Sequence, residues 1–109
     1  MKKKVLIIDD EQDFGLLLQS FFSKQQYDVK ISHTIADGMK ALEETKPDLL
    51  FLDNNLPDGL GWGKAEYILR KYPKTRLNLV SAYHVPNTIA NKFHIMEKPI
   101  SMDELKEML

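Results

Sequence analysis

Two uninterrupted apolar runs, Val5–Ile8 and Leu49–Leu52, constrain the fold of this chain more than any other feature. Neither run alternates with polar residues, which is typical of a β-strand covered on both faces, and such strands belong to parallel sheets. Both runs stop abruptly at aspartate. Three shorter segments have the composition of further strands: Val29–Ser32, Leu77–Val80 and Ile95–Met96.

Helical patterns fill the segments between the first strands. The first predicted helix has apolar residues at the i, i+3, i+4, i+7 and i+8 positions of one stripe: Phe14, Leu17, Leu18, Phe21 and Phe22. The second is predicted to begin at Thr34, which forms a capping-box-like pair with Asp37, and to end at Pro47. Its expected inward face consists of Ile35, Met39 and Leu42.

The second half of the chain continues this alternation. Residues 54–61 are rich in Asn, Pro, Asp and Gly, so we predict a loop there. The third helix, closed by Pro73, is marked by Trp62, Ala65, Leu69 and Tyr72. The last helix is predicted over residues 101–109, with a capping box of Ser101 and Glu104. Its expected inward residues are Leu105, Met108 and Leu109.

Strands that alternate with helices predict an α/β domain whose parallel sheet carries helices on both faces. The 109 residues correspond to one domain, and no repeat or linker divides residues 1–109. Hydrophobic residues make up 43% and charged residues 28% of the chain, which is ordinary for a folded globular protein and argues against disorder.

Composition excludes several function classes. The 15 Lys and Arg against 16 Asp and Glu give a net charge of −1, which argues against direct nucleic-acid binding. The absence of cysteine excludes disulfides and thiolate metal sites, and it fits a cytoplasmic location. No apolar run approaches the roughly 20 residues of a membrane span, so we expect no membrane association.

Polar residues follow the predicted strands: Asp9, Asp10, Asp53, Ser81 and Lys98. Because the carboxyl ends of parallel strands meet at one edge of a sheet, these side chains are expected to converge. Clustered carboxylates repel one another, and Mg²⁺ relieves that repulsion through oxygen ligands. A carboxylate can also attack phosphorus to form an aspartyl phosphate, while a lysine and a hydroxyl bind the phosphoryl oxygens. The pattern therefore predicts a site for a transferable phosphoryl group.

The joint pattern carries a resemblance to a known family. Asp9-Asp10-Glu11, the segment Leu52–Gly59, Ser81-Ala82 and Lys98-Pro99 resemble the CheY-like receiver domain of bacterial two-component response regulators. The resemblance extends over essentially the whole chain. It implies a flavodoxin-like, doubly wound fold with a five-stranded parallel sheet in the order 2-1-3-4-5.

The resemblance also implies a role for each site residue. Asp53 would be the phosphoacceptor. The metal ligands of a Mg²⁺ ion would be Asp10, Asp53, the backbone carbonyl of Asn55 and, through the same acidic pocket, Asp9. Ser81 and Lys98 would bind the phosphoryl oxygens. The implied phosphodonor is a sensor histidine kinase or phosphotransfer protein, and the implied output is a downstream effector protein or a fused output domain. Such a domain is a switch rather than an enzyme.

Two departures from the family pattern affect the expected output. The interval from Ser81 to Lys98 spans 17 positions, roughly five fewer than in comparable receivers and more than one helical turn. We therefore predict that the fourth helix is short, distorted or absent. The predicted switch region contains Ile95 and Tyr83. Ile95 stands where the family commonly has a switching Tyr or Phe, and Tyr83 or Phe93 is the alternative candidate for that role. The phosphorylation chemistry is expected to be intact and signal transmission modified.

Two rival functions stay open at this stage. A receiver-fold interaction module would act without phosphorylation, as the short fourth helix and Ile95 indicate. A Mg²⁺-dependent phosphohydrolase would use an aspartyl nucleophile, but such enzymes generally need a second acid two residues later. Asn55 occupies that position and counts against a hydrolase.

Overall fold

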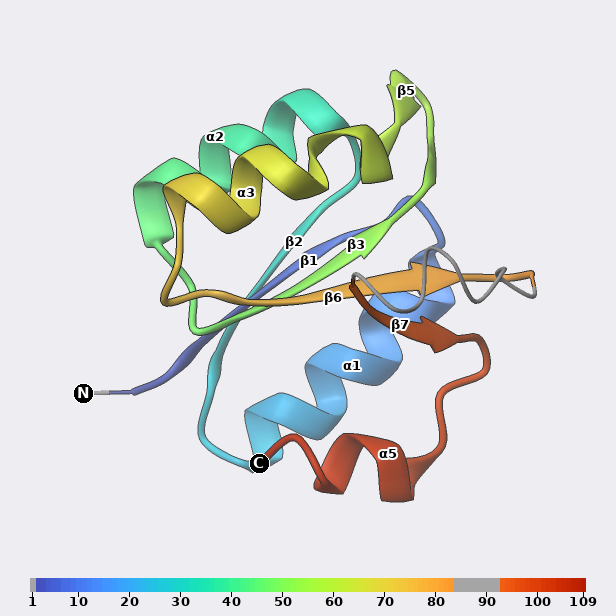
Figure 1. Ribbon diagram of the computed structural model, residues 1–109. Helices are drawn as coiled ribbons and strands as arrows, with labels where there is room; N and C mark the ends of the chain where they lie inside the picture. Colours follow the sequence, from blue (N-terminus) through green and yellow to red (C-terminus); the bar gives the residue numbers. More distant parts are fainter. Residues whose placement is uncertain (1, 84–92) are drawn as a thin grey trace.

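Five parallel strands form the central sheet of the computed structural model, which describes residues 2–83 and 93–109 (Figure 1). The strands are β1 (Lys4–Ile8), β2 (Asp28–Ser32), β3 (Leu49–Asp53), β6 (Arg76–Ser81) and β7 (His94–Glu97). Their spatial order is β2-β1-β3-β6-β7, and every neighbouring pair is parallel. This arrangement confirms the predicted fold class and strand order.

Helices cover both faces of the sheet, as predicted. Helices α2 (Ile35–Thr45) and α3 (Ala65–Lys71) lie on one face, and α1 (Gln12–Lys24) and α5 (Met102–Lys106) lie on the other (Figure 1). Successive residues of a strand point to opposite faces. Both faces of β1 and β3 must therefore be apolar, which explains the uninterrupted runs in the sequence.

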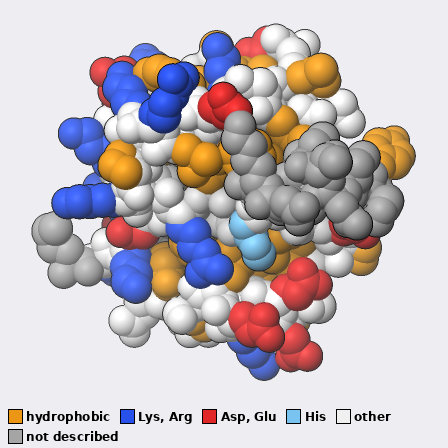
Figure 2. Space-filling view, viewed as in Figure 1, with side chains coloured by type: hydrophobic (Ala, Val, Ile, Leu, Met, Phe, Trp, Pro, Cys, Tyr) orange, Lys and Arg blue, Asp and Glu red, His pale blue; other side chains and the backbone are white. Residues whose placement is uncertain are grey.

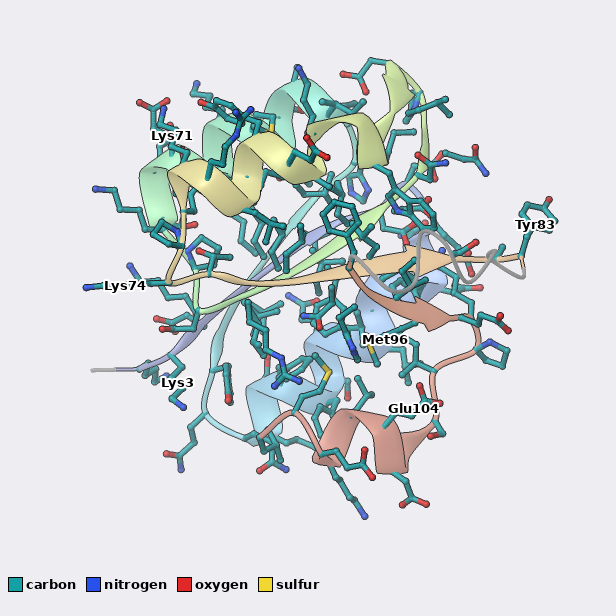
Figure 3. All side chains as sticks on the ribbon, viewed as in Figure 1. Lys3, Lys71, Lys74, Tyr83, Met96 and Glu104 are labelled. Atoms are coloured by element: carbon teal, nitrogen blue, oxygen red, sulfur yellow. The ribbon has the colours of Figure 1, made fainter. Side chains whose placement is uncertain are left out.

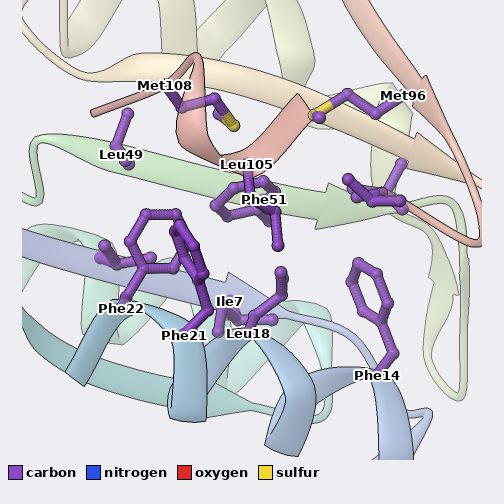
Figure 4. Packing of buried hydrophobic residues seen from close by; sticks show 13 residues of the cluster. Ile7, Phe14, Leu18, Phe21, Phe22, Leu49, Phe51, Met96, Leu105 and Met108 are labelled. Carbon is purple, nitrogen blue, oxygen red and sulfur yellow. The ribbon is translucent and has the colours of Figure 1, made fainter. Parts of the chain in front are cut away.

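Two hydrophobic clusters result, one on each face. The cluster beneath α1 and α5 contains Val5 and Ile7 of β1, and the cluster beneath α2 and α3 contains Leu6 and Ile8. Figure 4 shows the first cluster, in which Phe22 packs between Phe21 and Phe51 with ring centroids 5.0 and 5.7 Å away. Fully burying each such ring stabilises the fold by about 1.5–3 kcal/mol.

Two predicted helix starts are confirmed by their capping bonds. The Thr34 hydroxyl oxygen accepts a hydrogen bond of 3.1 Å from the backbone N–H of Asp37. Ser101 accepts from the backbone N–H of Glu104, and the Glu104 carboxylate accepts from the N–H of Ser101, which completes a capping box.

Three leucines predicted to face inward are exposed instead: Leu17 is 46%, Leu69 40% and Leu109 50% exposed. In α1, the five apolar positions span a wider arc than the sheet covers, and Leu17 falls outside it. In α3, Ile68 takes the fully buried position. Adjacent residues on a helix point about 100° apart, so burying Ile68 turns Leu69 outward.

Two predicted helix boundaries were wrong, and one predicted loop contains strands. The third helix begins at Ala65 and follows a 3₁₀ helix, η1 (Gly61–Lys64). The last helix ends at Lys106, and Leu109 therefore lies beyond it. The predicted loop contains a small antiparallel ribbon of β4 (Asn55–Leu56) and β5 (Gly59–Leu60).

The fourth helix, predicted to be short, distorted or absent, falls on residues 84–92 and lies outside the described part of the chain. In the described ranges 2–83 and 93–109, none of the helices combines the length and the hydropathy that crossing a membrane requires.

The contact between α2 and β1 leaves no room for a side chain at Gly38. A Cβ atom there would lie 2.5–2.9 Å from three side-chain carbons of Ile8, which is buried. Overpacking costs about 1–3 kcal/mol, and the upper part of this range applies because three carbons of Ile8 would lie under 3.0 Å away, so the cost exceeds the roughly 1 kcal/mol that alanine gains over glycine in a helix. We therefore expect Gly38→Ala to lower the free energy of unfolding by about 1–2 kcal/mol, measured by urea titration.

Gly63→Ala is the matched control because a Cβ atom at Gly63 meets no atom within 4 Å. That variant should keep or raise the stability, by up to about 1 kcal/mol. Equal stability of Gly38→Ala and the wild type would contradict the packing described here.

Candidate functional site

Three carboxylates meet at the carboxyl edge of the sheet. Asp9 follows β1, Asp10 comes next, and Asp53 ends β3. One carboxylate oxygen of each residue lies within 4.8 Å of the others. The cause is the register of the two central strands, in which Ile8 pairs with Leu52, so that the following residues stand side by side. Asp9 is 1% and Asp53 7% exposed, whereas Asp10 is exposed.

Lys98 reaches the acids from the end of β7. Its Nζ lies 2.8 Å from Oδ2 of Asp9 and 3.0 Å from Oε2 of Glu11. It also lies 4.5 Å from the centroid of the Phe14 ring, which is a cation–π contact. Burial alone would lower the pKa of Lys98, but the hydrogen bonds to Asp9 and Glu11 raise it above its ordinary value. Lys98 is therefore a fixed positive charge beside the acids.

Asp53 has a strongly perturbed acidity. Burial, together with the negative charge of Asp9, raises its pKa from 3.8 to about 6. The positive charge of Lys98 and a hydrogen bond from the Asn54 backbone oppose this rise, and Asp10 adds to it. The three carboxylates are close together. Hard oxygen donors with excess negative charge suit Mg²⁺, so these residues fit the predicted metal.

Charge is segregated along the sheet. Figure 2 shows Lys and Arg side chains gathered on the side of the molecule where the strands begin. Among them are Lys3, ahead of β1, and Lys71 and Lys74, near the end of α3 (Figure 3). Helix carboxyl ends lie on that side, and positive charge there is stabilised by the helix dipole. The three clustered carboxylates therefore lie at the opposite end of the strands from this group of lysines.

The other predicted site residues have different surroundings. The Ser81 hydroxyl donates to the carbonyl of Tyr83 at 2.8 Å and accepts from its N–H at 3.0 Å, so it is bonded within its own loop. Ser81 is nevertheless fixed beside Lys98, whose N–H donates to the Ser81 carbonyl at 2.8 Å. Asn55 is exposed on β4.

The two residues predicted for the switch region differ in burial. Ile95 is half-buried and packs with Phe93 against the cluster beneath α2 and α3. Tyr83 is 72% exposed and projects away from the domain beyond the end of β6 (Figure 3).

Sequence reasoning missed three residues that shape the site. The backbone N–H of Glu11 donates to Oδ1 of Asp9 at 2.8 Å, and its carboxylate binds Lys98. The side-chain oxygen of Asn54 accepts from the N–H of Trp62 at 3.1 Å. A Cβ atom at Gly61 would collide with the carbonyl oxygen of Asp53, so only glycine permits this close approach. The glycine was visible in the sequence, but its partner was not.

Comparison with known proteins gives one consistent result. Residues 5–109 match the family model of the response regulator receiver domain. Response regulator protein PilR of Pseudomonas aeruginosa is 28% identical over 113 residues, which cover 99% of this chain and 25% of PilR. Sporulation initiation phosphotransferase F of Bacillus subtilis is 27% identical over 117 residues, which cover 98% of this chain and 90% of that protein. The chain therefore spans about a quarter of PilR but most of the phosphotransferase.

Solved structures agree with this match. The response regulator TrrA of Thermotoga maritima, in complex with Mg²⁺-BeF, has a TM-score of 0.83 and 26% identity, and the alignment covers 97% of this chain and 95% of TrrA. A CheY-like receiver domain protein of Methanospirillum hungatei has a TM-score of 0.88 and 22% identity, with 99% and 90% of the two chains covered, and it supports the fold alone.

The raised pKa of Asp53 makes the stability of the metal-free protein depend on pH. The folded state binds the Asp53 proton more tightly than the unfolded state does. The protonated Asp53 therefore contributes to the free energy of unfolding below pH 3.8, and this stabilisation is lost as the pH rises through about 6. Asp53→Asn removes the charge. We expect the variant to be about 1 kcal/mol more stable than the wild type at pH 7.5, after discounting for solvent screening, and equal to it near pH 4.

Urea titrations at both pH values, without metal, measure this difference. Glu44→Gln is the control because Glu44 is exposed on α2, and a surface change there should stay within about 0.5 kcal/mol. A pH-independent effect of Asp53→Asn would refute the electrostatic account.

Proposed function

Because the chain belongs to the response regulator receiver domain family, we propose that it accepts a phosphoryl group on Asp53 and thereby switches its contacts with a downstream partner. Receiver domains are regulatory modules of two-component signalling. The observation that carries the proposal is the convergence of Asp9, Asp10 and Asp53 within 4.8 Å, beside the ammonium of Lys98. We propose one receiver domain over residues 1–109, acting in the cytoplasm.

The chemistry assigns a role to each residue. A carboxylate oxygen of Asp53 attacks the phosphorus of a phosphohistidine on a sensor kinase or phosphotransfer protein. A P–O bond forms, the P–N bond breaks, and the released imidazole nitrogen takes up a proton. Asp9, Asp10, Asp53 and the Asn55 carbonyl would hold Mg²⁺, which when bound neutralises charge on the phosphoryl oxygens.

Lys98 and Ser81 complete the proposed site. The Lys98 ammonium moves from Asp9 to one phosphoryl oxygen, and the Ser81 hydroxyl leaves the carbonyl of Tyr83 and donates to another. A surface cavity of about 400 Å³ beside Lys98 is lined in part by Glu11, Phe14 and Pro99. This cavity leaves room for a partner side chain beside Lys98.

A second candidate is an interaction module that binds its partner without phosphorylation. It is favoured by the Ser81 hydroxyl, which is engaged by the Tyr83 backbone, and by Ile95, which has no polar tip to move between buried and exposed positions. The same experiment separates the two candidates.

Incubation with acetyl phosphate and Mg²⁺ should add the mass of one phosphoryl group to the wild-type protein, measured by intact-protein mass spectrometry. Asp53→Asn should take up none, since its amide cannot attack phosphorus, while Glu44→Gln should match the wild type. Full uptake by Asp53→Asn would refute the assignment of the phosphoacceptor. No uptake by a wild-type protein that binds Mg²⁺ would favour the interaction module.

Mg²⁺ binding can be followed through Trp62, the single tryptophan of the chain. Its Nε1 donates to the carbonyl of Leu52, and its backbone N–H donates to Asn54, so it reports on both residues that flank Asp53. Asp10→Asn removes one negative oxygen ligand. We expect the Kd for Mg²⁺ to rise about tenfold, or ~1.4 kcal/mol, in a fluorescence titration. An unchanged Kd would exclude Asp10 from the metal site.

A further inference from the structure

The amino end of α2 is capped from two directions. Its own N-cap residue, Thr34, satisfies the backbone N–H of Asp37. The carboxylate of Asp58, more than twenty residues away in the sequence, accepts hydrogen bonds from two other backbone N–H groups of the helix. Oδ1 accepts from Ile35 at 2.7 Å, and Oδ2 accepts from Ala36 at 3.0 Å. These backbone bonds lower the pKa of Asp58, so the group is charged when it binds the helix.

Asp58 belongs to the segment that follows the phosphoacceptor. In the β4–β5 ribbon, Leu56 pairs with Gly59, so Pro57 and Asp58 form its tip. Gly59 has a φ of 141°, a conformation that favours glycine. The tip of the ribbon therefore rests on α2 through the Asp58 carboxylate.

The base of the same ribbon is fixed next to Asp53. The carbonyl of Asn54 accepts from the N–H of Gly61 at 2.8 Å, and its side chain accepts from Trp62. Between base and tip, Leu56 is buried in the cluster beneath α2 and α3, whereas Asn55, Gly59 and Leu60 are exposed. A two-stranded ribbon with a single buried side chain is marginal in water, so its position also depends on the hydrogen bonds at its two ends.

We propose that Asp58 is a positioning residue for the phosphoacceptor site. By tying the ribbon to α2, it holds the main chain of Asn54 and Asn55, and with it the carboxylate of Asp53, in the arrangement that accepts the metal and the phosphoryl group. The inference rests on the proposed function and adds to it a residue that touches neither the metal nor the phosphoryl group. The physical basis is that groups which orient ligands from outside the site typically change metal affinity by 10- to 100-fold.

The test compares two variants that remove caps from the same helix. Asp58→Ala removes the cap that links α2 to the ribbon, and Thr34→Ala removes the helix's own cap. Both should shift the urea midpoint downward to a similar extent, because both leave backbone N–H groups of α2 unsatisfied. Only Asp58→Ala should weaken Mg²⁺ binding, measured by Trp62 fluorescence, and slow uptake from acetyl phosphate, each about tenfold. For Thr34→Ala, the Kd for Mg²⁺ and the rate of uptake from acetyl phosphate should both stay within about twofold of the wild-type values.

Each outcome decides the proposal. Wild-type Mg²⁺ affinity in a folded Asp58→Ala would overturn it, as would equal losses in the two variants, which would mean that α2 stability alone matters. If Asp58→Ala does not fold, Asp58→Asn replaces it. That variant keeps one oxygen acceptor and should show a smaller loss in the same direction, whereas no loss would overturn the proposal.

Failure of the proposed function gives a different result. A wild-type protein that binds Mg²⁺ but takes up no phosphoryl group would refute phosphorylation, while the Mg²⁺ affinities of the two alanine variants would still decide the role of Asp58. A wild-type protein that does not bind Mg²⁺ would overturn both.

Discussion

Repulsion among carboxylates held at one end of a buried sheet is the interaction on which the rest of this structure depends. The sheet is stabilised by apolar residues on both faces, and its parallel register places Asp9 beside Asp53. Hydrophobic burial thus supports an arrangement that electrostatics alone would oppose. The result is a pocket of clustered carboxylates whose mutual repulsion a hard cation with oxygen ligands would relieve.

The loops around the pocket hold these charges in place through directed hydrogen bonds. Lys98 offsets part of the repulsion by pairing with Asp9 and Glu11. The backbone of the following segment is fixed at Asn54 and Gly61, and its tip is bonded to α2 by Asp58. Every one of these contacts joins residues from different parts of the chain or across a turn. The pocket therefore has a defined geometry although its loops are exposed.

Under the proposed function, a signal from this pocket would pass through a switch region that differs from the family's usual pattern. Ile95 packs against the cluster beneath α2 and α3 and has no polar group to exchange between two environments. Tyr83 is exposed and binds Ser81 through its backbone, not through its ring. Meanwhile, α2 and η1 are bonded directly to the segment that follows Asp53. Through these bonds, a charge change at Asp53 would reach α2 and η1 in the proposed switch.

The sequence by itself determined the fold class, the strand order through its family resemblance, and the residues that gather at the carboxyl edge. It did so because apolar runs, helical spacing and capping pairs are local patterns, and each is compatible with few secondary structures. Tertiary structure alone decided which leucines face water, since exposure of Leu17 depends on how far the sheet extends beneath α1. It also decided the ribbon after Asp53 and the bond from Asp58 to α2. Those features join residues distant in sequence, and no local periodicity encodes such a contact.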